Sequence, residues 1–193
     1  MVFYYPLEYT LMEITDSLET DIKDAPNWFH SSISQSPRKE NLNHPLGNVA
    51  YQVWDRKDAQ DIIILIHGTG AHKQWWDPIA PLLCNKFSII APDLPGMGES
   101  DHRNAYNFED FSDALIAIFH QEKIVQGNHK VYLVGHSLGG HVAGFMASEF
   151  PDLFHGVVMI DSPIRPPTYD YDKHQSTGPL RRIKYYPDKV SII

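Results

Sequence analysis

The sequence is poor in cysteine, in long apolar runs and in basic residues. Its single cysteine, Cys84, excludes a disulfide within the chain and favours a reducing compartment, the cytoplasm. No run approaches the ~20 apolar residues that a membrane-spanning helix needs, and the N-terminal stretch lacks the basic region of a signal peptide. The 16 Lys and Arg against 24 Asp and Glu give a net charge of −8, which argues against a nucleic-acid partner. The 11 histidines form no H-E-x-x-H or similar cluster, so we expect neither metal nor cofactor.

What the sequence does contain is an alternation of short apolar runs with helical patterns. Strands are expected over residues 48–54, 62–67, 87–92, 130–135 and 156–161, and helices over 76–84, 108–125 and 138–150. This order predicts an α/β fold, a mostly parallel sheet flanked by helices. The second helix places four apolar side chains on one face, those of Phe111, Leu115, Ile118 and Phe119.

The chain divides into three parts by composition. Residues 1–37 are interpreted as a loosely attached N-terminal arm, with a short helix over 11–22. Residues 38–161 carry the alternating pattern and form the core. Residues 162–193 are rich in proline and tyrosine, and are interpreted as the start of a lid or cap segment.

The strongest chemical signal is GHSLG at residues 135–139, which follows an apolar strand and opens a helix. A tight reversal from strand to helix forces the central residue into a strained backbone conformation and leaves no room for side chains two positions away. Gly135 and Gly139 have none. The pattern predicts a nucleophile elbow, with Ser137 as the nucleophile.

A nucleophilic serine needs hydrogen-bond donors for the oxyanion that forms when it attacks a carbonyl group. One donor is expected to be the backbone amide of Leu138. The other is expected from the glycine-rich HGTG loop at residues 67–70, and we assign it to the amide of Thr69, with Gly68 letting the loop approach the substrate. His67 ends a strand inside this motif, which favours an orienting role over that of a base.

Three stretches resemble the α/β-hydrolase superfamily: IIILIHGTGAHKQWWDPIAPLL, FSIIAPDLPGMGES and VYLVGHSLGGHVAGFMASEFPDLFHGVVMID. The resemblance covers residues 48–161 and implies strands 1–6 of that fold. It implies a serine hydrolase of carboxylic esters or related acyl compounds, because a serine nucleophile points away from the members that use aspartate. The resemblance also implies that GMGES, at residues 96–100, is a turn after a strand and that Asp93 fixes this turn. For Trp75 and Trp76 two roles stay open, a wall of the acyl pocket or packing in the core or lid.

The superfamily places its catalytic acid and histidine after strands 7 and 8, which this sequence lacks. Asp161 is the candidate acid, with capping of its turn as the alternative. The histidines at 72, 136, 141 and 174 are weak candidates for the base. We therefore expect the N-terminal part of a longer hydrolase, an exposed apolar edge strand at residues 156–160, and little or no turnover from this chain.

Two other functions stay open. The missing base fits a non-catalytic hydrolase-like protein that binds or regulates, and the same elbow also serves cofactor-free haloperoxidases and hydroxynitrile lyases of the superfamily. For the leading hypothesis the expected partner is a small ester-like substrate, with neither nucleic acid nor membrane as a partner. The sequence leaves the oligomeric state undetermined.

Overall fold

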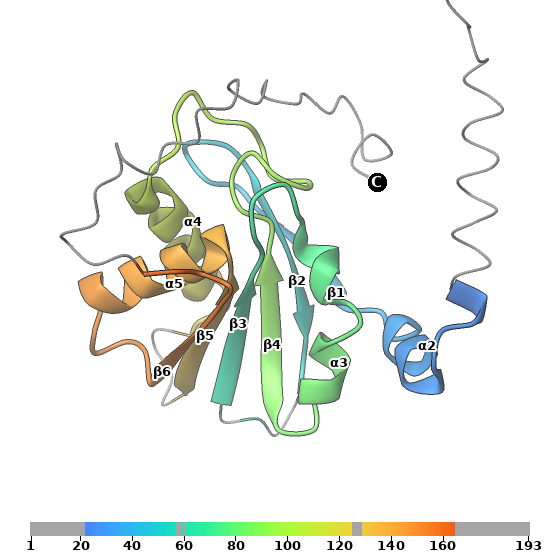
Figure 1. The fold of residues 1–193 in the computed structure, drawn as a ribbon. Coiled ribbons are helices and arrows are strands. Elements are labelled where there is room, and N and C mark those ends of the chain that lie inside the picture. Colours follow the sequence, from blue (N-terminus) through green and yellow to red (C-terminus); the bar gives the residue numbers. More distant parts are fainter. Residues whose placement is uncertain (1–21, 57–58, 60, 125–128, 165–193) are drawn as a thin grey trace, which may run out of the picture. The chain divides into compact units, whose positions relative to one another are not determined.

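A computed structural model describes residues 22–56, 59, 61–124 and 129–164 (Figure 1). The chain divides into two compact units, Met1–Ser36 and Pro37–Ile193. In the first unit, α2 spans Asn27–Ile33 and begins directly after Pro26, a residue that can precede a helix but not continue one. The sequence did not predict α2, and nearly all of the helix expected over 11–22 lies outside the described residues.

The second unit is built on a six-stranded sheet with the order β1-β2-β4-β3-β5-β6. Its strands are β1 (Arg38–Leu42), β2 (Val49–Trp54), β3 (Asp61–Ile66), β4 (Phe87–Pro92), β5 (Lys130–His136) and β6 (Gly156–Ile160). β1, β2 and β4 pair antiparallel, whereas β4, β3, β5 and β6 run parallel. The predicted α/β fold with a mostly parallel sheet is confirmed, and the central β3 is buried on both faces, as its continuous apolar sequence requires.

Helices cover both faces of this sheet (Figure 1). On one face, α4 (Phe108–Gln121) and α5 (Leu138–Glu149) pack on alternate strand residues such as Ile64 and Leu133. All four apolar residues predicted to share one face of α4 are buried. On the other face, Trp76 and Ala80 pack against Ile63 and Leu65. The sheet thus separates two hydrophobic clusters.

The helix expected over residues 76–84 is wrong in extent. The segment instead forms a 3₁₀ turn, η1 (Lys73–Trp76), followed by a short helix, α3 (Ala80–Leu83). Pro78 lies between them, and it has no amide to donate to a carbonyl oxygen of the preceding turn. Among the described residues, no helix is both long and apolar enough to cross a membrane.

The two edges of the sheet differ in polarity. β1 has the sequence RKENL, and the charged side chain of Arg38 bonds Glu40, Asp55 and Glu122. At the other edge, β6 exposes Val158 at 54%. The expectation of an exposed apolar edge at β6 is therefore confirmed within the described residues.

Candidate active site

The turn between β5 and α5 has the geometry that its sequence predicts. Ser137 adopts φ 50° and ψ −115°, in the left-handed region that non-glycine residues rarely occupy, and α5 begins at the next residue. A Cβ on Gly135 would overlap the carbonyl group of Gly139. A Cβ on Gly139 would overlap the backbone oxygens of Ile66 and His67. Only glycine fits at either position.

The backbone of Ser137 is held from neighbouring elements. Its amide donates to the carbonyl oxygen of Ile160 at 2.9 Å, and its carbonyl oxygen accepts from the hydroxyl of Ser162 at 2.9 Å. The amide of Gly140 also donates to that carbonyl, at 3.1 Å. These bonds fix a strained residue in place at the carboxyl end of the parallel strands, where α/β folds bind their ligands.

The loop between β3 and η1 passes directly beside this turn. A Cβ on Gly68 would lie 2.8 Å from Nδ1 of His136 and 3.1 Å from Cβ of Ser137, so the two backbones are in close contact. The amide of Ala71 donates to the carbonyl oxygen of Gly68 at 3.2 Å, and Gly70 between them has φ 74°, as in a type II turn. Thr69, at the tip of this turn, is exposed.

The start of α5 faces the same region as the loop. Leu138 is the first residue of the helix, and the amides of a first helical turn have no partner inside the helix. The N-terminal end of a helix also carries a partial positive charge. The amide of Leu138 therefore has the local setting of an oxyanion donor.

His67 is a positioning residue rather than a base. It is fully buried, its Nε2 accepts from the amide of Leu94 at 3.0 Å, and its Nδ1 donates to the carbonyl oxygen of Gly68 at 2.8 Å. The amide donor fixes the neutral tautomer. Burial lowers the pKa of the imidazole below its ordinary value, so His67 stays uncharged and ties β3 to the turn after β4.

Asp93 fixes the turn after β4, as expected, and does so with an unpredicted partner. Its carboxylate accepts from the backbone amide of Lys73 at 2.6 Å, from Nζ of Lys73 at 2.6 Å and from the amide of Glu99 at 2.7 Å. Gly98 has φ 56°, and a Cβ there would overlap this carboxylate. Asp93 and Lys73 are 0% and 1% exposed, so this is a buried ion pair beside the candidate site.

The two tryptophans after the loop separate in the structure. Trp75 is 55% exposed and stacks on the ring of His136, with centroids 5.5 Å apart and planes at 17°. Trp76 is 5% exposed and belongs to the core beneath the sheet. Trp75 thus lies beside the β5–α5 turn, whereas Trp76 packs in the interior.

Three of the remaining sequence candidates, Asp161, His141 and His72, are among the described residues. Asp161 follows β6, the neighbour of β5, and its carboxylate is exposed on a residue with φ 48°. Nε2 of His141 contacts the carbonyl oxygen of Pro163 at 3.3 Å, and Nδ1 of His72 contacts Oε1 of Gln74 at 2.7 Å. His174 and most of the segment interpreted as a lid lie outside the described residues.

An apolar cavity that the sequence did not predict opens beside Leu138. It measures about 390 Å³ and is lined by the turn after β4 (residues 95–97), His102, Tyr106, Phe111 and Leu138. Tyr106 stacks on Phe111, with ring centroids 6.1 Å apart, and its hydroxyl accepts from the amide of Arg103 at 3.0 Å. The residues that line this cavity come from separate parts of the sequence, so no local sequence pattern predicts it.

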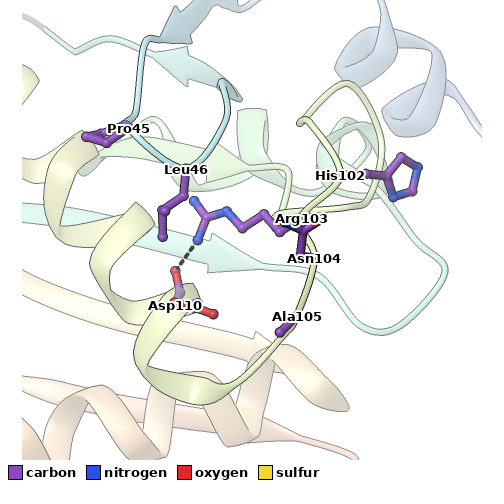
Figure 2. Close-up of a pocket in the computed structure, with 7 residues that line it drawn as sticks. All are labelled: Pro45, Leu46, His102, Arg103, Asn104, Ala105 and Asp110. Atoms are coloured by element: carbon purple, nitrogen blue, oxygen red, sulfur yellow. Dashed lines mark hydrogen bonds between the residues drawn. The ribbon is translucent and has the colours of Figure 1, made fainter.

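A second, polar pocket of about 480 Å³ shares His102 with the apolar cavity. Figure 2 shows Arg103 reaching across it toward the first turn of α4, where Nη1 donates to the backbone oxygen of Asp110 at 2.9 Å. Nη2 of Arg103 also contacts Nδ1 of His44 at 3.2 Å. Burial and the nearby guanidinium lower the pKa of His44.

Comparison with known proteins identifies the fold family. A model of the alpha/beta hydrolase family matches residues 63–189. The chain belongs to this family. Relatives include a probable serine hydrolase of Drosophila melanogaster, 33% identical over 147 residues, which covers 75% of this chain and 43% of that protein. A serine hydrolase-like protein of Danio rerio is 30% identical over 118 residues, covering 61% of this chain and 36% of its own length.

Solved structures share this fold. Cfl2 from Burkholderia cenocepacia superposes with a TM-score of 0.63 at 24% identity, over 76% of this chain and 48% of that one. The 2-hydroxy-6-oxo-6-phenylhexa-2,4-dienoate hydrolase of Rhodococcus sp. strain RHA1 gives 0.59 at 26% identity, over 68% and 50%. The chain spans less than half the length of these curated relatives and about half of these structures.

Proposed function

We propose that this alpha/beta hydrolase acts on carboxylic esters or related acyl compounds, with Ser137 as its nucleophile. The observation that carries the proposal is the strained Ser137 backbone, at the start of α5 and in contact with Gly68. Relatives named as serine hydrolases, and a 34% identical pimeloyl-[acyl-carrier protein] methyl ester esterase of Neisseria meningitidis, support the same chemistry.

The proposed reaction proceeds through an acyl-enzyme. Oγ of Ser137 attacks the carbonyl carbon as a base takes its proton, and the amides of Leu138 and Thr69 stabilise the resulting oxyanion. The alcohol leaves with a proton, and the acyl group stays on Ser137. Water then attacks the same carbon and releases the carboxylic acid. Gly68 lies against Ser137, and Trp75 stacks on the adjacent His136, so we assign both residues contacts with the substrate.

The apolar cavity supplies a place for the acyl chain. It adjoins Leu138, the residue whose amide is proposed to bind the oxyanion, and it is lined by the rings of Tyr106 and Phe111. Burial of methylene groups there would contribute about 0.8 kcal/mol each. Esters of acids with several carbons should therefore be preferred over acetate.

We keep Asp161 as the proposed acid, because its carboxylate is exposed at the end of β6, beside β5. Among the histidines near the turn, His67 bonds Leu94 and His141 contacts Pro163, whereas His136 stacks on Trp75 with its Nδ1 buried. A base that receives the Ser137 proton is therefore not proposed among them. For this reason we expect slow hydrolysis by the 193-residue chain.

Hydrolysis of p-nitrophenyl butyrate by the wild type, Ser137→Ala and Ser148→Ala tests the proposal. Ser148 is an exposed serine of the same helix, and its hydroxyl bonds only the carbonyl of Phe145 among the contacts described. We expect Ser137→Ala to hydrolyse the ester no faster than buffer, and Ser148→Ala to match the wild type. Hydrolysis faster than buffer that persists undiminished in Ser137→Ala would contradict the proposal and favour a binding or regulatory role.

A further inference from the structure

The loop that carries Thr69 is attached at both of its ends to the turn after β4. At its start, Nε2 of His67 accepts from the amide of Leu94 at 3.0 Å. At its end, the backbone amide and Nζ of Lys73 donate to the two carboxylate oxygens of Asp93, each at 2.6 Å. The two anchor points on the β4 side are adjacent residues. Residues 68–72 therefore span two fixed points.

Lys73 is an unusual anchor because its charge is buried. Its side chain is 1% exposed, and Nζ also donates to Oε2 of Glu99 at 2.6 Å. Gln52 on β2 holds the carbonyl oxygen of Lys73 through Nε2 at 3.1 Å. A buried ion pair is a weak source of stability, because desolvation of both charges offsets their attraction. What these bonds supply is a fixed orientation of the residue.

The position of Lys73 determines where the segments on both sides of it lie. Toward the N-terminus, it sets the end of the turn in which Ala71 bonds Gly68, the residue in contact with Ser137. Toward the C-terminus, η1 carries Trp75 onto the ring of His136. A displacement of Lys73 would therefore move Gly68, which lies against Ser137, and Trp75, which lies against the adjacent His136.

We propose that Lys73 is a positioning residue that holds the Thr69 amide and Trp75 at the working distance from Ser137. The inference rests on the proposed function. An oxyanion donor acts on charge that develops in the transition state, so its displacement slows the chemical step and leaves substrate binding nearly unchanged. Loss of the Lys73 anchor thus lowers kcat strongly, whereas KM changes only as far as the shift of Trp75 weakens one substrate contact.

Lys73→Met removes the charge and its donors while keeping an unbranched side chain of similar length. We expect kcat for p-nitrophenyl butyrate to fall on the order of 10- to 100-fold, with KM within about threefold, at a temperature well below the melting point of the variant. Tyr51→Phe is the matched control, because Tyr51 is a buried residue of β2 that lies away from the loop. The substitution removes a hydroxyl that donates to Oε1 of Glu122 at 2.6 Å. It should lower the melting temperature and leave kcat unchanged.

If Lys73→Met does not fold, Lys73→Arg decides the question. Its planar guanidinium keeps the charge, but it cannot reproduce the compact contacts of the ammonium with Asp93 and Glu99. We again expect a lower kcat at similar KM. A wild-type kcat in the folded variant overturns the proposal.

Hydrogen exchange of the Ala71 amide, which donates to the carbonyl oxygen of Gly68, gives a readout that is independent of activity. Exchange should accelerate in the Lys73 variant and not in Tyr51→Phe, because only the first releases the loop. Unchanged exchange in a folded Lys73 variant overturns the positioning role. If Ser137→Ala shows instead that the proposed function is wrong, the exchange result still decides whether Lys73 holds the loop.

Discussion

Two turns meet at the carboxyl edge of this sheet, and they are shaped by opposite means. The β5–α5 turn is shaped by missing side chains, since Gly135 and Gly139 leave room that any Cβ would fill. The β3–η1 loop is shaped by side-chain bonds, since His67 and Lys73 tie it to the turn after β4. The shape of the β5–α5 turn is encoded by five consecutive residues, whereas that of the β3–η1 loop depends on residues that come together only in the folded chain.

The largest effect should come from adding a methyl group inside the first turn. Gly139→Ala would drive its Cβ into the backbone oxygens of Ile66 and His67, which cannot move aside, and we expect the free energy of unfolding to fall by about 3 kcal/mol or more. Gly144→Ala is the control in the same helix, because its Cβ would rest 3.5 Å from Sδ of Met159. It should be neutral, or stabilising by up to about 1 kcal/mol. Urea unfolding measures both, and similar stabilities would show that sterics do not shape the turn.

An intermediate effect is expected where the two turns touch. Gly68→Ala pushes against the ring of His136 and Cβ of Ser137, which can shift by a few tenths of an ångström, so we expect a stability loss of about 1–2 kcal/mol. Ester hydrolysis should fall more steeply, because the loop moves away from Ser137. Gly70→Ala has open space at its Cβ and only its φ of 74° to disfavour it. It should reduce hydrolysis less than Gly68→Ala; the reverse order would refute the close contact.

The smallest effect concerns the second turn and depends on pH. His67 and His44 have pKa values lowered in the folded state, so the unfolded chain binds more protons below pH ~6.5. The free energy of unfolding should therefore decrease as the pH falls from about 6.5 toward 5, mainly through the buried His67, because solvent screens the more exposed His44. Denaturant titrations at several pH values should give a shallower decrease for His67→Gln. His120→Gln, at an exposed position of α4, should follow the wild type.

The contrast between the turns explains what could be predicted. The strain at Ser137 and the buried face of α4 follow from local spacing and were predicted from sequence. Strand β1 was not predicted. It is an edge strand made mostly of charged residues, so its sequence lacks the apolar alternation that marks a half-buried strand. The interruption before α3 could have been read from Pro78, whose missing amide breaks a helix.

The buried ion pair of Lys73 and the apolar cavity have no comparable signal. A lone lysine in a loop is ordinarily solvated, and its partner Asp93 lies 20 residues further along the chain. One cue was available: the carboxyl ends of parallel β3 and β4 meet at the same edge, so residues just past each strand lie together. The cavity combines the turn after β4, α4 and the start of α5, and only the packed chain brings them together.

The central claim is that the hydroxyl of Ser137 forms a covalent bond with its substrate. A fluorophosphonate probe, followed by intact-mass and peptide mass spectrometry, tests this directly in the wild type and in Ser137→Ala. The account predicts one adduct per chain, located on Ser137 and absent from the variant. The adduct should form slowly, because no base is proposed among the histidines near the turn. A chain that stays unlabelled, or an adduct that persists in Ser137→Ala, would contradict it.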